Sequence, residues 1–198
     1  MVAGRKDARV TRRQLGSVTI LAIVLIAVAA IAFYALTPSL RLKNASKAPI
    51  VGKAQVGQPA PPFAVSTTDG LFDLQSTGKP VFLEIFATWC PHCQRETATI
   101  DKLYQKYKSR VDFVGVSGSD TAIDGTTASS QLDVLNWARR FNVQYPVAYD
   151  ESLAVANSYL QGAFPTLAII GKDKNVAYLN TGEVSYGDLA GALDKALR

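Results

Sequence analysis

The sequence predicts an α/β sandwich with a mixed central sheet. Short apolar runs with the length of buried strands alternate with longer segments in which apolar residues recur at helical spacing. A last strand and helix follow one of these strands through a short turn, which indicates that the sheet is not wholly parallel. The chain has 198 residues, and without its first segment, which lacks a globular composition, it is long enough for one such domain.

The domain begins with a predicted β-hairpin and a buried strand. Residues 63–66 and 71–74 flank Thr67-Thr68-Asp69-Gly70, and the Asp-Gly pair favours a tight turn. Residues 81–86 form a compact apolar run that is entered through Lys79-Pro80. Such a run is typical of a strand with both faces buried.

Helices and strands alternate over the rest of the chain. Residues 91–107 predict a helix, because proline suits the first turn and Ile100, Leu103, Tyr104 and Tyr107 form one apolar face. The following expected elements are a strand over 111–116, a loop over 117–130, a helix over 131–141, a strand over 147–149, a helix over 151–160, a strand over 166–170, a strand over 176–179, a turn over 180–182, and a helix from the N-cap Ser185 to Leu197.

An uncharged run of 22 residues, 15–36, predicts a single transmembrane helix before the domain. At about 1.5 Å per residue it spans roughly 33 Å, against about 30 Å for the hydrocarbon core of a bilayer. The apolar region of a cleaved signal peptide is shorter, roughly 7–15 residues, so we expect an uncleaved signal anchor. Residues 1–14 then form a basic cytoplasmic N-terminus, residues 37–56 a polar tether, and residues 57–198 the domain.

The positive charge of the chain lies outside the domain. Residues 1–53 carry nine basic residues and one acidic residue, whereas residues 54–198 carry twelve basic and fifteen acidic ones. The domain therefore has a net charge of −3, although the whole chain has +5. This distribution excludes the basic surface that a nucleic-acid-binding domain needs.

The two cysteines of the chain, Cys90 and Cys93, predict redox chemistry. A Cys-x-x-Cys that follows a buried strand and opens a helix is a redox motif. The free N–H groups of the helix start favour a thiolate at Cys90, the expected nucleophile, and Cys93 resolves the mixed disulfide. A structural zinc needs four ligands, and His92 is the one histidine of the chain, so we expect no metal. A structural disulfide that closes so short a loop would stabilise the fold little.

A resemblance to thioredoxin lies in residues 81–93, whose sequence is VFLEIFATWCPHC. From about Gly57 onward the chain is similar to the TlpA-like family of membrane-tethered thiol-disulfide oxidoreductases, whose hairpin and extra segment between Val116 and Pro146 it shares. The resemblance implies a thioredoxin-like fold, protein thiols and disulfides as substrates, and no cofactor. It also implies an extracytoplasmic domain and a membrane electron carrier as redox partner, and we expect a monomer.

The resemblance assigns roles to a loop and to a buried acid. Phe164-Pro165-Thr166 matches the loop whose proline is cis and packs against the dithiol, where it presents its backbone to an extended substrate. Glu84, six residues before Cys90, matches the buried aspartate of thioredoxin. Because a carboxylate in an apolar strand is costly, we expect Glu84 to have a raised pKa and to relay a proton to Cys93. The alternative is that Glu84 faces a polar edge or pairs with a lysine.

The residues around the cysteines set substrate contact and redox direction. We expect Trp89 to shield the dithiol and to contact substrates together with Pro91, Phe164 and Thr166, and a plain core position is the alternative for Trp89. His92 can stabilise the Cys90 thiolate and make the protein more oxidising. Pro-His is the dipeptide of the strong oxidant DsbA, whereas TlpA-like proteins are mostly reductases. We therefore expect a reductase, with an oxidase as the alternative.

Two other activities occur on the same fold and fit this sequence poorly. A peroxidase needs a Pro-x-x-x-Thr-x-x-Cys motif, and Leu83 and Ala87 occupy its proline and threonine positions. A copper-binding module would need a distal histidine and a wider cysteine spacing, and the chain has neither.

Overall fold

The computed structural model describes residues 52–198. The predicted basic N-terminus, the transmembrane helix over 15–36 and most of the tether lie outside these residues. Between residues 52 and 198, no helix is long and apolar enough to cross a membrane.

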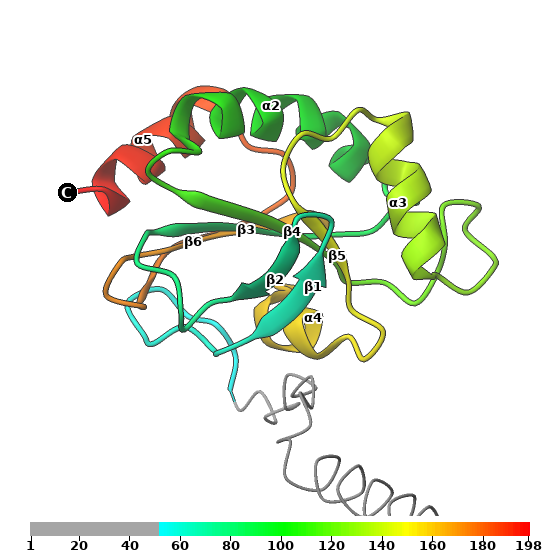
Figure 1. The fold of residues 1–198 in the computed structure, drawn as a ribbon, viewed down its shortest axis with the longest axis horizontal. Coiled ribbons are helices and arrows are strands. Elements are labelled where there is room, and N and C mark those ends of the chain that lie inside the picture. The colour runs from blue at the N-terminus through cyan, green and yellow to red at the C-terminus, as the bar shows by residue number, and fades with distance from the viewer. Residues whose placement is uncertain (1–51) are drawn as a thin grey trace, which may run out of the picture. The chain divides into compact units, whose positions relative to one another are not determined.

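Seven strands form one mixed sheet with the order β2-β1-β5-β4-β3-β6-β7 (Figure 1). The strands are β1 (Ala64–Thr67), β2 (Gly70–Asp73), β3 (Val81–Phe86), β4 (Asp112–Ser117), β5 (Val147–Tyr149), β6 (Thr166–Ile170) and β7 (Val176–Thr181). The central strands β3, β4 and β5 are parallel, whereas β1 joins β5 and β6 joins β3 in antiparallel fashion. The predicted thioredoxin-like α/β fold with its N-terminal hairpin is therefore confirmed.

Helices cover both faces of this sheet (Figure 1). They are α2 (Pro91–Tyr107), α3 (Gln131–Arg140), α4 (Ala154–Tyr159) and α5 (Tyr186–Ala196). Helices α2, α3 and α5 pack on one face of the sheet, and α4 packs on the other. Strand β3 serves both layers, because its side chains alternate: Phe82 and Phe86 belong to the first core, and Leu83 and Ile85 to the second.

The helix expected over residues 151–160 is shorter and begins at Ala154. The Asp150 carboxylate accepts hydrogen bonds from the N–H groups of Ser152 (3.2 Å) and Val155 (2.7 Å). Leu153 adopts a left-handed backbone with φ 53°. The aspartate thus stabilises a turn in place of the first helical residues, a competition that is common for this side chain.

Strand β7 continues past the expected end at residue 179. Asn180 and Thr181, expected in a turn, pair with Leu167 and Thr166 of β6. The turn comes at Gly182 instead, whose φ of 78° suits glycine. The longer strand delivers the segment after Gly182 to the end of the sheet where β3 leads into α2.

Trp137, to which the sequence assigns no role, belongs to the core. Its side chain is fully buried and stacks on Phe86, with ring centroids 4.2 Å apart and an interplanar angle of 17°. Phe86 is the last residue of β3. The stacked pair therefore holds α3 against the strand that leads into the cysteine motif.

Candidate active site

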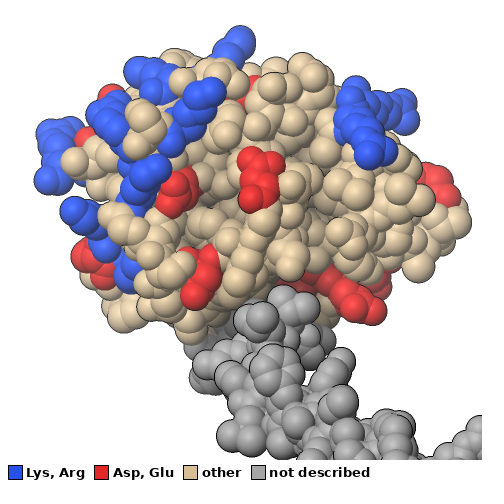
Figure 2. All heavy atoms as spheres, viewed as in Figure 1, with Lys and Arg blue, Asp and Glu red and all other residues tan. Residues whose placement is uncertain are grey.

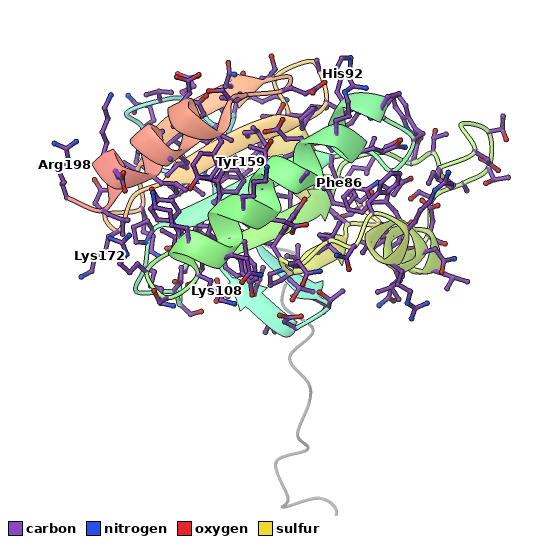
Figure 3. The ribbon with its side chains drawn as sticks, turned by 90° about the horizontal axis from the view of Figure 1, so that it is seen from above. Phe86, His92, Lys108, Tyr159, Lys172 and Arg198 are labelled. Atoms are coloured by element: carbon purple, nitrogen blue, oxygen red, sulfur yellow. The ribbon has the colours of Figure 1, made fainter. Side chains whose placement is uncertain are left out.

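The dithiol lies at the start of α2. Cys90 is the N-cap residue with an extended backbone (φ −77°, ψ 117°), and Pro91 occupies the first turn of the helix. No acidic residue stands in this turn, so its free N–H groups and the helix dipole favour negative charge at Cys90. Figure 3 shows the adjoining His92 at one end of α2 and Lys108 at the other.

The two cysteines differ in their surroundings. Cys90 is 4 % exposed and Cys93 is fully buried. Burial raises the pKa of Cys93 far above its usual range, and the nearby charge of Glu84 raises it further. Cys93 therefore holds its proton until a base removes it. The roles of nucleophile for Cys90 and resolving thiol for Cys93 agree with this asymmetry and stay predictions.

The loop before β6 closes over Cys90. The Phe164–Pro165 peptide bond is cis, as the loop pattern predicts, and the Phe164 carbonyl oxygen lies 3.7 Å from Cys90 Sγ. Gly118 makes this approach possible: a Cβ at this position would lie 3.1 Å from the Phe164 ring and 2.5 Å from Ile85 Cγ2.

Thr166 shapes this loop from within. Its side chain is fully buried, donates a hydrogen bond to the Ala163 carbonyl at 2.9 Å, and accepts one from the Gln161 N–H at 3.1 Å. The hydroxyl is therefore already used inside the protein. The substrate contact predicted for Thr166 stays a prediction.

Trp89 and Phe164 flank Cys90 with apolar surface. Trp89 is 39 % exposed, and its ring meets Phe164 edge-on at a centroid distance of 5.9 Å. The Trp89 indole N–H donates to Ser119 Oγ at 2.8 Å, so the segment after β4 fixes its orientation. Pro91 is exposed beside it. The ring is thus not a plain core aromatic, and its contact with substrates stays a prediction.

Glu84 is fully buried on the face of β3 that α2 covers. Burial raises its pKa to about 8, against the hydrogen bond from Tyr145, and the charges of Glu96 and Asp101 add to this rise. The Tyr145 hydroxyl donates to Oε2 at 2.6 Å, whereas Oε1 has no partner. Gly115 leaves room for the tyrosine, because a Cβ there would lie 3.0 Å from its ring. The predicted rise in pKa is confirmed, and the partner is a tyrosine, not a lysine.

Glu96 is a second buried acid that the sequence analysis missed. It is 2 % exposed, its Oε2 accepts from the Val184 N–H at 3.3 Å, and its Oε1 has no partner. Burial raises its pKa to about 7. The signal was available: Glu96 lies three residues after Cys93, on the helix face that continues through Ile100.

The His92 ring contacts Glu183, and its predicted effect on the Cys90 thiolate stays a prediction. Its Nδ1 lies 2.6 Å from Glu183 Oε1, and Arg95 reaches the same oxygen at 2.5 Å. The polar contact of Cys90 Sγ is with the Phe164 carbonyl. The sequence offers no signal for Glu183, because 91 residues separate it from His92.

The family model described as Redoxin matches residues 55–195. This chain belongs to the redoxin family. Thiol-disulfide oxidoreductase ResA of Bacillus cereus is 32% identical over 148 residues, which cover 72% of this chain and 79% of that protein. ResA of Geobacillus thermodenitrificans is 32% identical over 139 residues, which cover 68% and 74%.

A solved structure also resembles this redoxin. The thioredoxin-family thiol:disulfide interchange protein of Chlorobium tepidum superposes with a TM-score of 0.59 at 28% identity, covering 74% of this chain and all of the other. Together with the relatives, this places the chain among TlpA-like members of the thioredoxin superfamily. It is a protein thiol-disulfide oxidoreductase.

The cysteine roles predict different trapping by the two serine variants. Cys93→Ser leaves Cys90 to form a mixed disulfide that cannot be resolved, so it accumulates complexes with clients, whereas Cys90→Ser does not. In the reduced protein, iodoacetamide at mildly acidic pH modifies Cys90 and spares the buried, protonated Cys93. Non-reducing gels and peptide mass spectrometry measure both. Equal trapping by the two variants would contradict the assignment.

A second prediction concerns Glu84→Gln, which keeps an acceptor for Tyr145 but cannot carry a proton. We expect disulfide exchange near neutral pH to slow by roughly 10²-fold, the lower end of acid–base catalysis. Stopped-flow exchange with a small disulfide measures this rate. The exposed Glu151 supplies the control, because Glu151→Gln removes a carboxylate outside the site.

The same variant changes the pH dependence of stability. With a folded-state pKa of about 8 against an ordinary 4.5, Glu84 keeps a proton in the native state that the unfolded chain has lost. The free energy of unfolding therefore falls as pH rises through this window, and Glu84→Gln reduces the fall. Urea unfolding at several pH values measures the free energy of unfolding.

For the exchange reaction, Glu84→Gln rates equal to those of wild type across this pH window, with the fold intact, would remove Glu84 from the mechanism.

Proposed function

We propose that this protein reduces disulfide bonds of protein clients through the Cys90-Pro91-His92-Cys93 dithiol, on the extracytoplasmic side of a membrane to which it is anchored. The observation that carries the proposal is the meeting of Cys90, at a helix N-terminus, with the Phe164 carbonyl 3.7 Å from its sulfur. The exposed Trp89 ring lies beside them. An extended client segment along this loop brings its disulfide to Cys90.

The reaction proceeds in two exchange steps. The Cys90 thiolate attacks one sulfur of the client disulfide, and the other client sulfur leaves as a thiolate and takes up a proton. Cys93 then loses its proton and attacks Cys90 Sγ, which releases the second client thiol and closes the Cys90–Cys93 disulfide. Two electrons pass to the client, and a membrane electron carrier returns two to the protein.

The second step needs a base beside a buried thiol. Glu84, with a pKa of about 8, and Glu96, with a pKa of about 7, are buried carboxyl groups whose raised pKa values suit a base near neutral pH. Glu84 is close enough for its charge to raise the pKa of Cys93. Near neutral pH a fraction of Glu84 is ionised and can accept the Cys93 proton, and the proton returns to Cys93 when the carrier reduces the Cys90–Cys93 disulfide again.

A thiol oxidase is the second candidate, because the dipeptide Pro91-His92 is that of a strong oxidant. A thiolate at Cys90 that is stabilised by His92 would stabilise the reduced protein and raise its reduction potential. The contacts of His92 favour the reductase, because its Nδ1 lies against Glu183 at 2.6 Å.

The reduction potential of the Cys90–Cys93 couple distinguishes the two directions. We expect a value near that of thioredoxin, about −270 mV, and a value near about −120 mV would make the protein an oxidant. Equilibration with glutathione or dithiothreitol buffers, followed by alkylation and mass spectrometry, measures it. Failure to form the Cys90–Cys93 disulfide in any buffer would refute thiol exchange itself.

The proposed anchor makes a separate prediction. Because residues 15–36 are uncharged and long enough to cross a bilayer, the full chain should stay in the membrane fraction after alkaline carbonate washing. Protease added from outside should reach the domain. A chain without residues 15–36 is the control and should be soluble. Release of the wild type with a new N-terminus near residues 29–34 would instead show a cleaved signal peptide.

A further inference from the structure

Three charged or titratable side chains meet beside the dithiol. Glu183 Oε1 lies 2.6 Å from His92 Nδ1 and 2.5 Å from Arg95 Nη2, and Arg95 Nε donates to both carboxylate oxygens at 3.1 and 3.3 Å. His92 Nδ1 and Arg95 Nη2 are themselves 2.8 Å apart. When Nδ1 carries a proton, this last contact joins two donors. The carboxylate is then the acceptor that holds the two groups together.

Glu183 is held in place by its backbone neighbours. The Gly182 N–H donates to the Pro165 carbonyl at 2.8 Å, and the Val184 N–H donates to Glu96 Oε2 at 3.3 Å. Both bonds join the turn after β7 to groups of the active site. The side chain of Glu183 is 37% exposed, but the hydrogen bonds of the residues before and after it fix its backbone next to the active site.

Arg95 lies within electrostatic reach of Cys90. The hydrogen bond to Glu183 raises the pKa of Arg95, and the charge of Cys90 raises it further. Conversely, Arg95 and His92 hold the pKa of Glu183 below its usual range, so the carboxylate is ionised at neutral pH. Most Lys and Arg side chains visible in Figure 2 gather instead at the end of the domain where α5 ends.

We propose that Glu183 is a positioning residue that holds His92 by its Nδ1 and cancels much of the positive charge of the His92–Arg95 pair. Cys90 is thereby deprived of stabilisation that this pair would give its thiolate. The dithiol stays a stronger reductant than the Pro-His dipeptide alone predicts. This inference rests on the proposed function and names the residue that tunes the same site.

The effect operates on one balanced reaction. When the dithiol reduces glutathione disulfide, Cys90 and Cys93 together lose two electrons and two protons as their S–S bond forms, and two glutathione thiols appear. A stabilised Cys90 thiolate favours the reduced protein and shifts this equilibrium towards the dithiol. Removal of the Glu183 charge therefore makes the protein more oxidising.

The test compares the full-length wild type with Glu183→Gln and with Asp69→Asn. Asp69 is an exposed acid in the β1–β2 turn, and Asn-Gly suits that turn equally well. It lines a surface depression with Lys108, at the end of α2 remote from His92 (Figure 3). We expect Glu183→Gln to shift the equilibrium with glutathione roughly tenfold towards the dithiol, or about 30 mV. Asp69→Asn, which removes the same charge, should leave it unchanged.

Two further measurements separate charge tuning from a loss of structure. In a background of His92→Gln with Arg95→Gln, the Glu183→Gln substitution should no longer move the potential, because the groups through which it acts are absent. The shift should also shrink as salt rises from about 0.05 M to 1 M, since these side chains are exposed to solvent.

The outcomes separate the inference from the proposed function. If the wild type equilibrates with glutathione and Glu183→Gln gives the same potential, the inference is wrong and the oxidoreductase stands. An equal shift in the background without His92 and Arg95 also overturns it. If the wild type forms no Cys90–Cys93 disulfide in any buffer, the proposed function itself fails.

Discussion

The burial of strand β3 on both faces is the constraint on which the rest of the structure depends. All six residues from Val81 to Phe86 are buried, and each face supports its own layer of helices. The strand therefore cannot shift without breaking both cores, and it ends four residues before Cys90. The stacking of Trp137 on its last residue extends this hold to α3. The Cys90 sulfur is thus placed by a fully buried strand.

The buried strand also carries a titratable side chain. This side chain is Glu84, and burial raises the pKa of its carboxyl group to about 8. Glu96 approaches from the helix with a pKa near 7, and like charges in a buried region discourage simultaneous ionisation. The charge of Glu96 adds to the rise in the pKa of Glu84, although burial is the main cause of that rise. In the proposed mechanism, Glu84 is the acid that exchanges a proton with the buried Cys93 thiol near neutral pH.

The elements that local spacing defines were predictable, and the contacts between distant segments were not. Val81–Phe86 and Pro91–Tyr107 agree with their predicted bounds, because apolar periodicity and the first-turn proline are local signals. Tyr145 and Glu183 reach the site from segments that the sequence does not link to Cys90, so their roles appear only in three dimensions. The extension of β7 to Thr181 has the same origin, since pairing with β6 outweighs the turn tendency of Asn180.

The buried acids and the exposed polar side chains near the dithiol differ in what we propose that they do. The two acids Glu84 and Glu96 are buried. In such surroundings the ionised form of a carboxyl group is costly, so its proton is hard to remove. The side chains of His92, Arg95 and Glu183 are partly exposed to solvent, and we propose that single substitutions there change the electrostatic potential at Cys90. If Glu183 has the role that we propose, the Pro91-His92 dipeptide alone does not determine the redox direction of the dithiol. In the proposed role of Glu183, its contacts with His92 and Arg95 limit the stabilisation that the His92–Arg95 pair gives the Cys90 thiolate, and so favour a reductant.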